Sequence, residues 1–229
     1  MQGLRHIAII MDGNRRWAQE HGKLSTSGHR FGAETLAEIC KEAAKMDLEF
    51  LTVYAFSTEN IKRSDREVSL LLGLITEYMK YCRSVSMENN IRFGSIGDRS
   101  GLPEALREEI RLTEEVTSGN TGMCLTVAIN YGGRNEMARA FQRMLDDGIR
   151  RENVTEELIS SYLDTKDIPD PDLVIRTSGE CRLSNFMLWQ MAYSELYFTD
   201  KYWPDFTVRD LKIAIDKFKE RSRRFGLSE

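Results

Sequence analysis

Short apolar runs alternate along the chain with longer segments of helical periodicity. The apolar runs lie at 4–11, 50–56, 91–97, 123–130, 173–176 and 195–199. The helical patterns lie at 28–46, 67–88, 103–118, 134–148, 155–163 and 207–224. This alternation predicts an α/β fold with a mostly parallel central sheet of about six strands and helices on both faces. No repeat, low-complexity stretch or proline-rich linker divides the chain, so we expect residues 1–229 to form a single domain.

The helix predicted over 67–88 has a wider apolar surface than one core-facing stripe requires. The stripe consists of Val68, Leu71, Leu72, Ile75, Met79 and Cys82, and it is widened by Leu70, Leu74, Tyr78 and Tyr81. One interpretation is a helix buried on two sides, in the core or in a dimer. The other is a helix that forms one wall of a pocket for a long apolar ligand.

Polar, glycine-containing or arginine-bearing segments follow four of the predicted strands. They occupy 12–17, 57–63, 130–134 and 176–185. Because the carboxyl ends of parallel strands meet at one edge of a sheet, we expect these segments to converge there. Arginines form bidentate hydrogen bonds to phosphate oxygens, and Gly13 allows a ligand to approach the backbone closely. The four segments together predict a diphosphate site.

A carboxylate among these arginines needs an explanation, because it would repel a bare diphosphate. Asp12 fits if it binds Mg²⁺, which takes one or two carboxylates together with phosphate oxygens, and Glu195 is a candidate second ligand. The alternative is that Asp12 caps a helix that starts near Asn14 and that the arginines form surface salt bridges.

Composition and absent motifs exclude several classes of protein. With 36 acidic and 32 basic residues, the chain carries a formal charge of −4, which argues against a general nucleic-acid binder. No apolar run reaches the ~18–20 residues that span a bilayer, and the apolar start is too short for a signal peptide. The four cysteines are dispersed, which favours neither a zinc site nor disulfides and is typical of a cytoplasmic protein. The chain has no Walker, GxGxxG or DDxxD motif.

Several blocks of the sequence resemble the cis-prenyltransferase family, of which undecaprenyl diphosphate synthase is a bacterial member. The N-terminal half contributes HIAIIMDGN at 6–14, RWA at 16–18, GH at 28–29 and YAFSTEN at 54–60. The C-terminal half contributes NYGGR at 130–134, DLVIRTSGE at 172–180, RLSNF at 182–186, ELYFTD at 195–200, WPDF at 203–206 and RFG at 224–226. The blocks follow the family order over almost the whole chain.

The resemblance implies a homodimeric α/β enzyme with an apolar tunnel. Such an enzyme condenses isopentenyl diphosphate with an allylic prenyl diphosphate to form a Z (cis) polyprenyl diphosphate. By the same resemblance Asp12 and Glu195 hold Mg²⁺, and Asp12 and Asn60 are catalytic. No nucleic acid is implied as a partner, whereas peripheral membrane contact is expected when the product leaves.

The resemblance also assigns the substrate-binding residues. The allylic diphosphate is expected at Gly13, Asn14, Arg15, Arg16, Trp17 and His29. Isopentenyl diphosphate is expected at Arg176, Arg182 and Ser184, with help from residues 224–226 of the partner subunit. The segment near the reacting carbons supplies Ser57, Thr58, Glu59, Asn60 and Arg63.

The chain departs from the family pattern at a few positions. Ser25 and Ile61 replace an arginine and a tryptophan that chain-lengthening members usually carry, and Cys181 replaces a glutamine or histidine. Two other functions therefore stay open: an atypical condensation of two short allylic diphosphates, and a non-catalytic subunit that binds polyprenyl diphosphates. Retention of Asp12, Asn60 and the arginines favours an enzyme. Met123 and Cys40 are candidates for the floor of the tunnel.

Overall fold

The computed structural model of the chain describes residues 3–220. The predicted helix over 207–224 therefore ends outside the described residues, and so does the RFG block at 224–226. Within the described part, no helix combines the length and the apolar character needed to cross a membrane.

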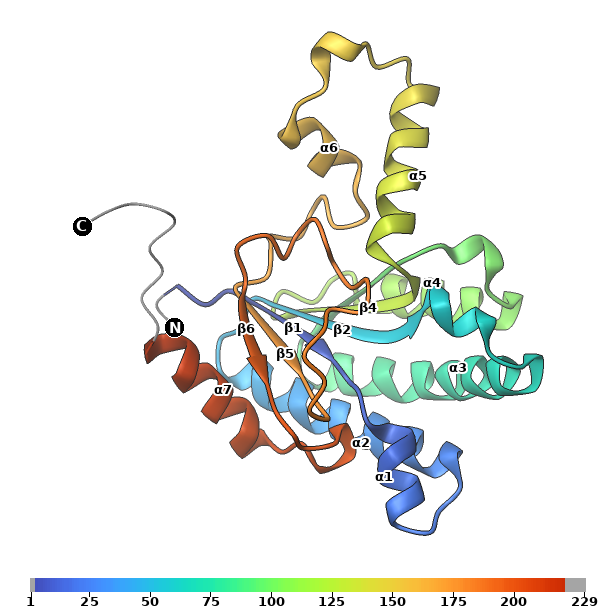
Figure 1. Cartoon of the computed structure of the whole chain (residues 1–229), viewed down its shortest axis with the longest axis vertical. Helices are drawn as coiled ribbons and strands as arrows, with labels where there is room; N and C mark the ends of the chain where they lie inside the picture. The colour runs from blue at the N-terminus through green and yellow to red at the C-terminus, as the bar shows by residue number, and fades with distance from the viewer. Residues whose placement is uncertain (1–2, 221–229) are drawn as a thin grey trace.

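A parallel sheet forms the centre of the molecule (Figure 1). Its strands are β1 (His6–Ile10), β2 (Phe50–Ser57), β3 (Arg92–Ile96), β4 (Cys124–Tyr131), β5 (Leu173–Arg176) and β6 (Glu195–Phe198). They lie side by side in the order β3-β4-β2-β1-β5-β6, and every neighbouring pair is parallel. The predicted mostly parallel sheet of about six strands is confirmed. Each predicted apolar run coincides with one strand to within two residues at either end.

Seven α-helices connect and cover these strands in the described residues. They are α1 (Asn14–Glu20), α2 (Ser25–Lys45), α3 (Asp65–Glu88), α4 (Glu104–Thr117), α5 (Gly133–Asp146), α6 (Glu156–Tyr162) and α7 (Val208–Glu220). The start of α3 has a clear local cause, because the Ser64 hydroxyl accepts a hydrogen bond from the Glu67 amide, and Asp65 and Glu67 place negative charge in the first turn. A short 3₁₀ helix, η1 (Thr58–Lys62), follows β2 and leads into α3.

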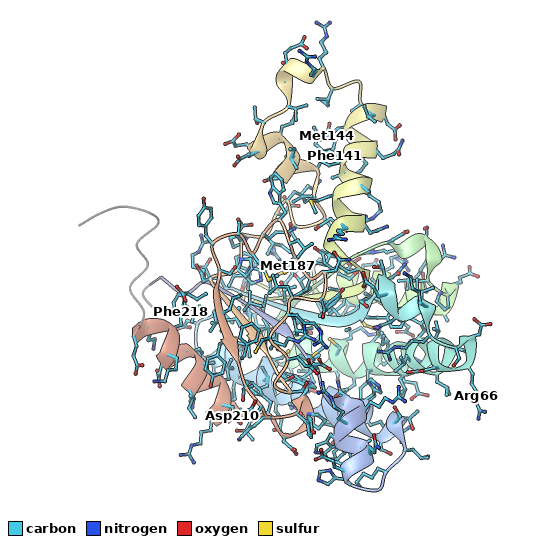
Figure 2. The ribbon with its side chains drawn as sticks, in the orientation of Figure 1. Arg66, Phe141, Met144, Met187, Asp210 and Phe218 are labelled. Atoms are coloured by element: carbon cyan, nitrogen blue, oxygen red, sulfur yellow. The ribbon has the colours of Figure 1, made fainter. Side chains whose placement is uncertain are left out.

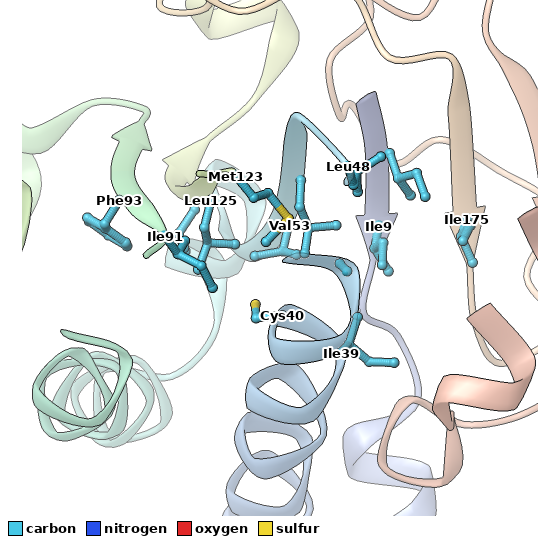
Figure 3. Packing of buried hydrophobic residues seen from close by; sticks show 14 of the residues in the cluster. Ile9, Ile39, Cys40, Leu48, Val53, Ile91, Phe93, Met123, Leu125 and Ile175 are labelled. Atoms are coloured by element: carbon cyan, nitrogen blue, oxygen red, sulfur yellow. The ribbon is translucent and has the colours of Figure 1, made fainter. Parts of the chain in front are cut away.

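Alternate residues of the strands face two different cores. Ile7 and Ile9 of β1 point into the larger core, where the buried faces of α2, α3, α4 and α7 pack against the sheet. Figure 3 shows part of this core around Val53, Ile39 and Leu125. The opposite face of the sheet packs against a smaller cluster that contains Phe186, Met187 and Met191 from the segment after β5.

Helices α5 and α6 project from the body of the molecule, away from α7 (Figure 1). Figure 2 places Phe141 and Met144 of α5 far from Phe218 of α7. Arg139 of α5 donates to the Asp164 carboxylate after α6 at 3.0 Å, and this carboxylate ties the projection to the body by accepting a hydrogen bond from the Gly97 amide at 3.1 Å. A cavity of about 640 Å³ lies between α5 and α6, and its lining contains none of the predicted site residues.

Candidate active site

A cavity of about 770 Å³ opens at the carboxyl edge of the sheet. Asp12 lies just past the end of β1, Ser57 ends β2 and Arg176 ends β5, so the parallel register brings the three residues to the same edge. Thirteen of the predicted site residues line this cavity: Asp12, Gly13, Asn14, Arg15, Arg16, His29, Ser57, Glu59, Asn60, Arg63, Arg176, Arg182 and Ser184. Three of the four predicted polar segments therefore meet at this cavity, whereas no residue of the segment 130–134 lines it.

The Asp12 carboxylate is bound on both oxygens. Its Oδ2 accepts a hydrogen bond from Arg176 Nη2 at 2.9 Å, and its Oδ1 accepts one from the Gly13 amide at 2.7 Å. Burial raises the pKa of Asp12, but the hydrogen bonds from Arg176 and Gly13 and the charges of Arg176 and Arg16 outweigh it. The pKa of Asp12 is therefore lower than usual, and the group is an ionised carboxylate.

The start of α1 excludes a capping role for Asp12. The cap residue of this helix is Gly13, and no side chain accepts a hydrogen bond from the first turn. Gly13 has a φ of +99°, and a Cβ at this position would lie 2.6 Å from the Tyr202 ring and 2.8 Å from the Ser178 Cβ. Only glycine allows both this backbone turn and the close approach of Tyr202.

Arg176 is the buried cation of the site. Its side chain is 4% exposed, and its guanidinium donates to the Ser184 hydroxyl at 2.8 Å and to the Arg182 carbonyl oxygen, besides Asp12. Its Nε is buried and has no hydrogen-bond partner among the described residues. These partners fix the direction of the guanidinium, and Arg176 lines the cavity.

Glu180 joins two of the predicted phosphate-binding arginines. Its Oε1 lies 2.9 Å from Arg16 Nη1, and its Oε2 pairs with Arg182 Nη1. The hydrogen bond from Arg182 is the main reason why the pKa of Glu180 lies below its usual value. The sequence analysis missed this role, although the position of Glu180 between Arg176 and Arg182 in one loop was the available signal.

Ser57 and Asn60 orient each other at the start of η1. The Ser57 hydroxyl accepts a hydrogen bond from the backbone N–H of Asn60 at 3.3 Å. In return, the side-chain oxygen of Asn60 accepts one from the backbone N–H of Ser57 at 3.1 Å. Asn60 therefore offers a ligand its NH₂ group as a donor. Nearby, the Glu59 carboxylate accepts from Asn185 Nδ2 at 2.7 Å, and Asn185 is a cavity residue that the sequence analysis missed.

His29 is neutral at physiological pH. Burial, followed by the positive charge of Arg63, lowers the pKa of His29 to about 4, and the charge of Glu67 opposes this only in part. The imidazole can donate or accept a hydrogen bond in the cavity but adds no charge to it.

The far end of the cavity is apolar. Leu36 of α2 and a row of α3 residues line it, together with Val127 of β4, and the row consists of Leu71, Leu74, Ile75, Tyr78, Met79 and Cys82. The sequence analysis left two interpretations of the broad apolar surface of α3, and these lining residues favour the one in which the helix forms a wall of a pocket. Cys40 and Met123, the residues expected at the floor, do not line the cavity and are buried in the larger core (Figure 3).

Two predicted substrate-binding residues also lie outside the cavity. Trp17 is 6% exposed, its indole donates to Asp205 Oδ1 at 2.8 Å, and its ring packs against Phe31. It therefore anchors α1 to the protein interior. Thr58 packs against the backbone of Gly132, where a Cβ would lie 2.5 Å from the Thr58 hydroxyl.

Glu195 does not approach Asp12 within the chain. Glu195 begins β6 and pairs with Leu173, which in turn pairs with Ile7 of β1. Asp12 lies five residues beyond Ile7, which is roughly 16 Å further along the strand direction. Glu195 is thus at the opposite edge of the sheet, because it stands at the start of its strand.

The described residues nevertheless fit a magnesium ion at Asp12. No group of three or more His, Cys, Asp or Glu side chains converges in the described part of the chain. Asp12 is ionised, its side chain is 30% exposed, and it lines the cavity. A hard oxygen ligand of this kind suits Mg²⁺, which commonly keeps waters and takes substrate phosphate oxygens beside one carboxylate.

Comparisons with known proteins show the family of the chain. Residues 10–226 match the family model described as a putative undecaprenyl diphosphate synthase. An isoprenyl transferase of Wolinella succinogenes is 48% identical over 223 residues, which cover 97% of this chain and 96% of that protein.

Two solved structures are similar to nearly the whole chain. A lavandulyl diphosphate synthase from Lavandula x intermedia, in complex with dimethylallyl diphosphate, has a TM-score of 0.93 and 36% identity, covering 97% of this chain and 98% of that one. A probable undecaprenyl diphosphate synthase from Campylobacter jejuni has a TM-score of 0.84 and 34% identity, covering 99% and 100%. The chain therefore belongs to the undecaprenyl diphosphate synthase family and is a prenyltransferase.

Proposed function

We propose that the chain condenses isopentenyl diphosphate with an allylic prenyl diphosphate and forms Z double bonds in a Mg²⁺-dependent reaction. The observation that carries the proposal is the two-sided cavity. Asp12, Arg16, Arg176 and Arg182 gather at one end, and aliphatic side chains of α3 line the other. A diphosphate with a hydrocarbon tail has the same division into a charged end and an apolar end.

The charged end divides into two groups of residues. The allylic diphosphate is assigned to the start of α1, with Gly13, Asn14, Arg15 and Arg16, and to His29. Isopentenyl diphosphate is assigned to Arg176, Arg182 and Ser184, a group supported by the hydrogen bond that joins Arg176 to Ser184. We expect Ser57, Glu59, Asn60 and Arg63 between the two groups, beside the reacting carbons.

Each turnover forms one carbon–carbon bond and breaks one carbon–oxygen bond. The isopentenyl double bond attacks the allylic carbon, diphosphate leaves with the electron pair of the broken bond, and one proton is lost. Arginines that are already oriented stabilise the charge that develops on the leaving diphosphate. Bound Mg²⁺ would be held by Asp12 and would supply further positive charge at the same oxygens.

Asn60 has an orienting role in this proposal. Its side-chain oxygen is occupied by the Ser57 amide, and an amide is not a useful base. Its NH₂ group can donate to a diphosphate oxygen, so the proton is assigned to a diphosphate oxygen or a water.

We further propose a cytoplasmic homodimer of single-domain subunits that contacts the membrane only peripherally, at product release. The projecting α5–α6 segment supports a dimer, because Phe141 is 45% exposed and Leu145 is 71% exposed. All four cysteines are free thiols, which suits a reducing compartment. In this dimer, Glu195 could be a magnesium ligand only at the Asp12 site of the other subunit, because Glu195 and Asp12 of one chain lie at opposite edges of the sheet.

A second candidate is the condensation of two short allylic diphosphates. The structural similarity to a lavandulyl diphosphate synthase that binds dimethylallyl diphosphate, a short allylic diphosphate, favours this candidate (TM-score 0.93). Ser25 and Ile61 favour it too, because they depart from the pattern of chain-lengthening members. One experiment separates the two: mass spectrometry of products made from dimethylallyl, geranyl or farnesyl diphosphate, with and without labelled isopentenyl diphosphate. Elongation requires the label in every product, whereas the second candidate yields product from dimethylallyl diphosphate alone. No product in any mixture would leave the non-catalytic subunit as the better reading.

A further inference from the structure

The segment 130–134 does not line the cavity, yet its backbone holds a residue that does. Asn185 lines the cavity, and its backbone carbonyl oxygen accepts a hydrogen bond from the Gly133 N–H at 2.7 Å. Its side-chain oxygen accepts a second one from the backbone N–H of Arg134 at 2.9 Å. Both donors belong to the first turn of α5, where a helix leaves its N–H groups without partners inside the helix. The start of α5 therefore holds both the backbone and the side chain of Asn185.

Gly132 allows the loops to approach α5 this closely. A Cβ at Gly132 would lie 2.7 Å from Asn185 Nδ2 and 2.5 Å from the Thr58 hydroxyl oxygen. Any side chain at this position would therefore push Asn185 and η1 away from the start of α5.

The turn that carries Asn185 has an unusual backbone. Asn185 has a φ of +62°, and its neighbour Ser184 has a φ of +47°. Most side chains avoid this left-handed region, and asparagine enters it more readily than other residues except glycine. The turn gives the two side chains different partners, because the Ser184 hydroxyl accepts from Arg176 while Asn185 contacts η1.

The amide nitrogen of Asn185 bridges to the segment after β2. Its Nδ2 donates to Glu59 Oε1 at 2.7 Å, and Glu59 directly precedes Asn60, whose side chain is held by Ser57. Asn185 thus joins the loops that follow β2, β4 and β5. Ser184 belongs to the group assigned to isopentenyl diphosphate, and Asn60 is expected beside the reacting carbons. The bridge therefore runs between the two parts of the site that must be aligned for the reaction.

We propose that Asn185 is a positioning residue that acts through Glu59 and holds η1 at a fixed place relative to bound isopentenyl diphosphate. The inference rests on the proposed function and adds a residue to the same site. The turn itself keeps other anchors, because Arg176 donates to the Ser184 hydroxyl and to the Arg182 carbonyl oxygen. Loss of the Asn185 side chain should therefore displace η1 more than it weakens the binding of isopentenyl diphosphate.

The test separates turnover from binding in Asn185→Gly, which tolerates the left-handed backbone and deletes only the side-chain bridge. We expect kcat to fall roughly ten- to a hundredfold, the effect of losing a hydrogen bond to a charged group. The Kd of isopentenyl diphosphate, measured by calorimetry without primer, should change less than about threefold, because removal of an interaction made only in the transition state leaves ground-state binding unchanged.

A charge-conserving exchange provides the rescue. Asn185→Asp places a second carboxylate against Glu59 and should lower kcat at least as far as Asn185→Gly. The double variant Asn185→Asp/Glu59→Gln restores the hydrogen bond with donor and acceptor reversed, so we expect it to regain most of the kcat of Glu59→Gln. Asn135→Asp is the matched control, since Asn135 accepts from Arg139 Nε at 3.0 Å, does not line the cavity and should keep its kcat.

The outcomes distinguish this inference from the proposed function. An unchanged kcat in Asn185→Gly would overturn the inference and leave elongation standing, and so would a Kd that rises as far as kcat falls. Absence of rescue beside an active Glu59→Gln would also overturn it. If Glu59→Gln alone is inactive, the comparison of kcat and Kd in Asn185→Gly decides. Failure of the wild-type chain to incorporate labelled isopentenyl diphosphate would overturn the proposed function, and the inference with it.

Discussion

The exchange of Asp12 for asparagine tests the charge of the site with little change of shape. Asparagine keeps one acceptor oxygen, which can accept from either the Gly13 amide or Arg176, while its NH₂ group faces the other donor; it also cannot balance the Arg176 guanidinium or hold a cation as strongly. We expect kcat to fall by ~10²–10³, the usual cost of removing one oriented electrostatic element from an active site. We also expect the dependence of the rate on Mg²⁺ to flatten.

The same exchange should lower the stability of the ligand-free protein. Breaking a buried ion pair costs ~3–5 kcal/mol, but the Asp12 side chain is 30% exposed and solvent screens it. We therefore expect a loss of ~1–2 kcal/mol, which corresponds to roughly 2–8 °C in Tm for a chain of this length. Asp12 has a lowered pKa, so this stabilisation is present above the unfolded pKa and is lost as the pH falls through the folded pKa.

A thermal-shift assay with inorganic diphosphate gives a readout that does not depend on turnover. In the wild-type chain, Mg²⁺ should increase the stabilisation by diphosphate, because it relieves the repulsion between the ligand and Asp12. In Asp12→Asn, diphosphate alone should stabilise and added Mg²⁺ should change little. Asp98→Asn is the matched control, since Asp98 receives hydrogen bonds from Ser100 and does not line the cavity. Near wild-type turnover of Asp12→Asn with an unchanged Mg²⁺ response would refute the proposed metal site.

Three further predictions follow from the same contacts. Arg182→Ala should raise the KM for isopentenyl diphosphate ten- to a hundredfold, about 1.4–2.8 kcal/mol, and leave Tm unchanged because Arg182 is exposed. Arg176→Ala should raise this KM and also lower Tm, because Arg176 is buried. An unchanged KM would remove Arg182 from the site. The wild-type chain should lose free energy of unfolding as the pH falls from 6.5 to about 4, because the folded protein disfavours protonation of His29. His29→Gln should make this loss smaller in urea unfolding, and an unaltered pH profile would contradict the lowered pKa. Leu145→Asp should shift the proposed dimer to a monomer in light scattering, and an unchanged mass would exclude the α5–α6 segment as the interface.

The strands were predictable because parallel strands are buried on both faces and appear as continuous apolar runs. The run at 173–176 gives β5, and it brings Arg176 to the sheet edge by the same rule that brings Asp12 there. Their order in the sheet was not predictable, because it depends on contacts between strands distant in sequence. Thus β1 lies between β2 and β5, which no local pattern of apolar residues determines.

The site residues that sequence reasoning misplaced have physical reasons. Glu195 opens its strand, so the rule of strand ends sends it to the opposite edge, although the residue pattern and the family resemblance both predicted it beside Asp12. Trp17 lies on the buried side of α1, where the pattern of a seven-residue helix is too short to reveal a face. The pairing of Glu180 with Arg16 joins positions 164 residues apart, a contact that only the folded chain creates.

The charges around the cavity favour the proposed cation. Arg16, Arg176 and Arg182 form ion pairs with Asp12 and Glu180, so three positive charges face two negative ones. The net charge of this network is then only +1, while each bound diphosphate brings several negative charges. Two diphosphates side by side would leave a large excess of negative charge in a partly desolvated cavity, where repulsion is strong. If Glu180 gave up its ion pairs so that Arg16 and Arg182 could bind the diphosphates, the excess of negative charge would stay, because the carboxylate of Glu180 would still lie nearby. A divalent cation at Asp12 both reduces the excess and turns a repulsive carboxylate into a ligand, which supports Mg²⁺ as part of the proposed reaction.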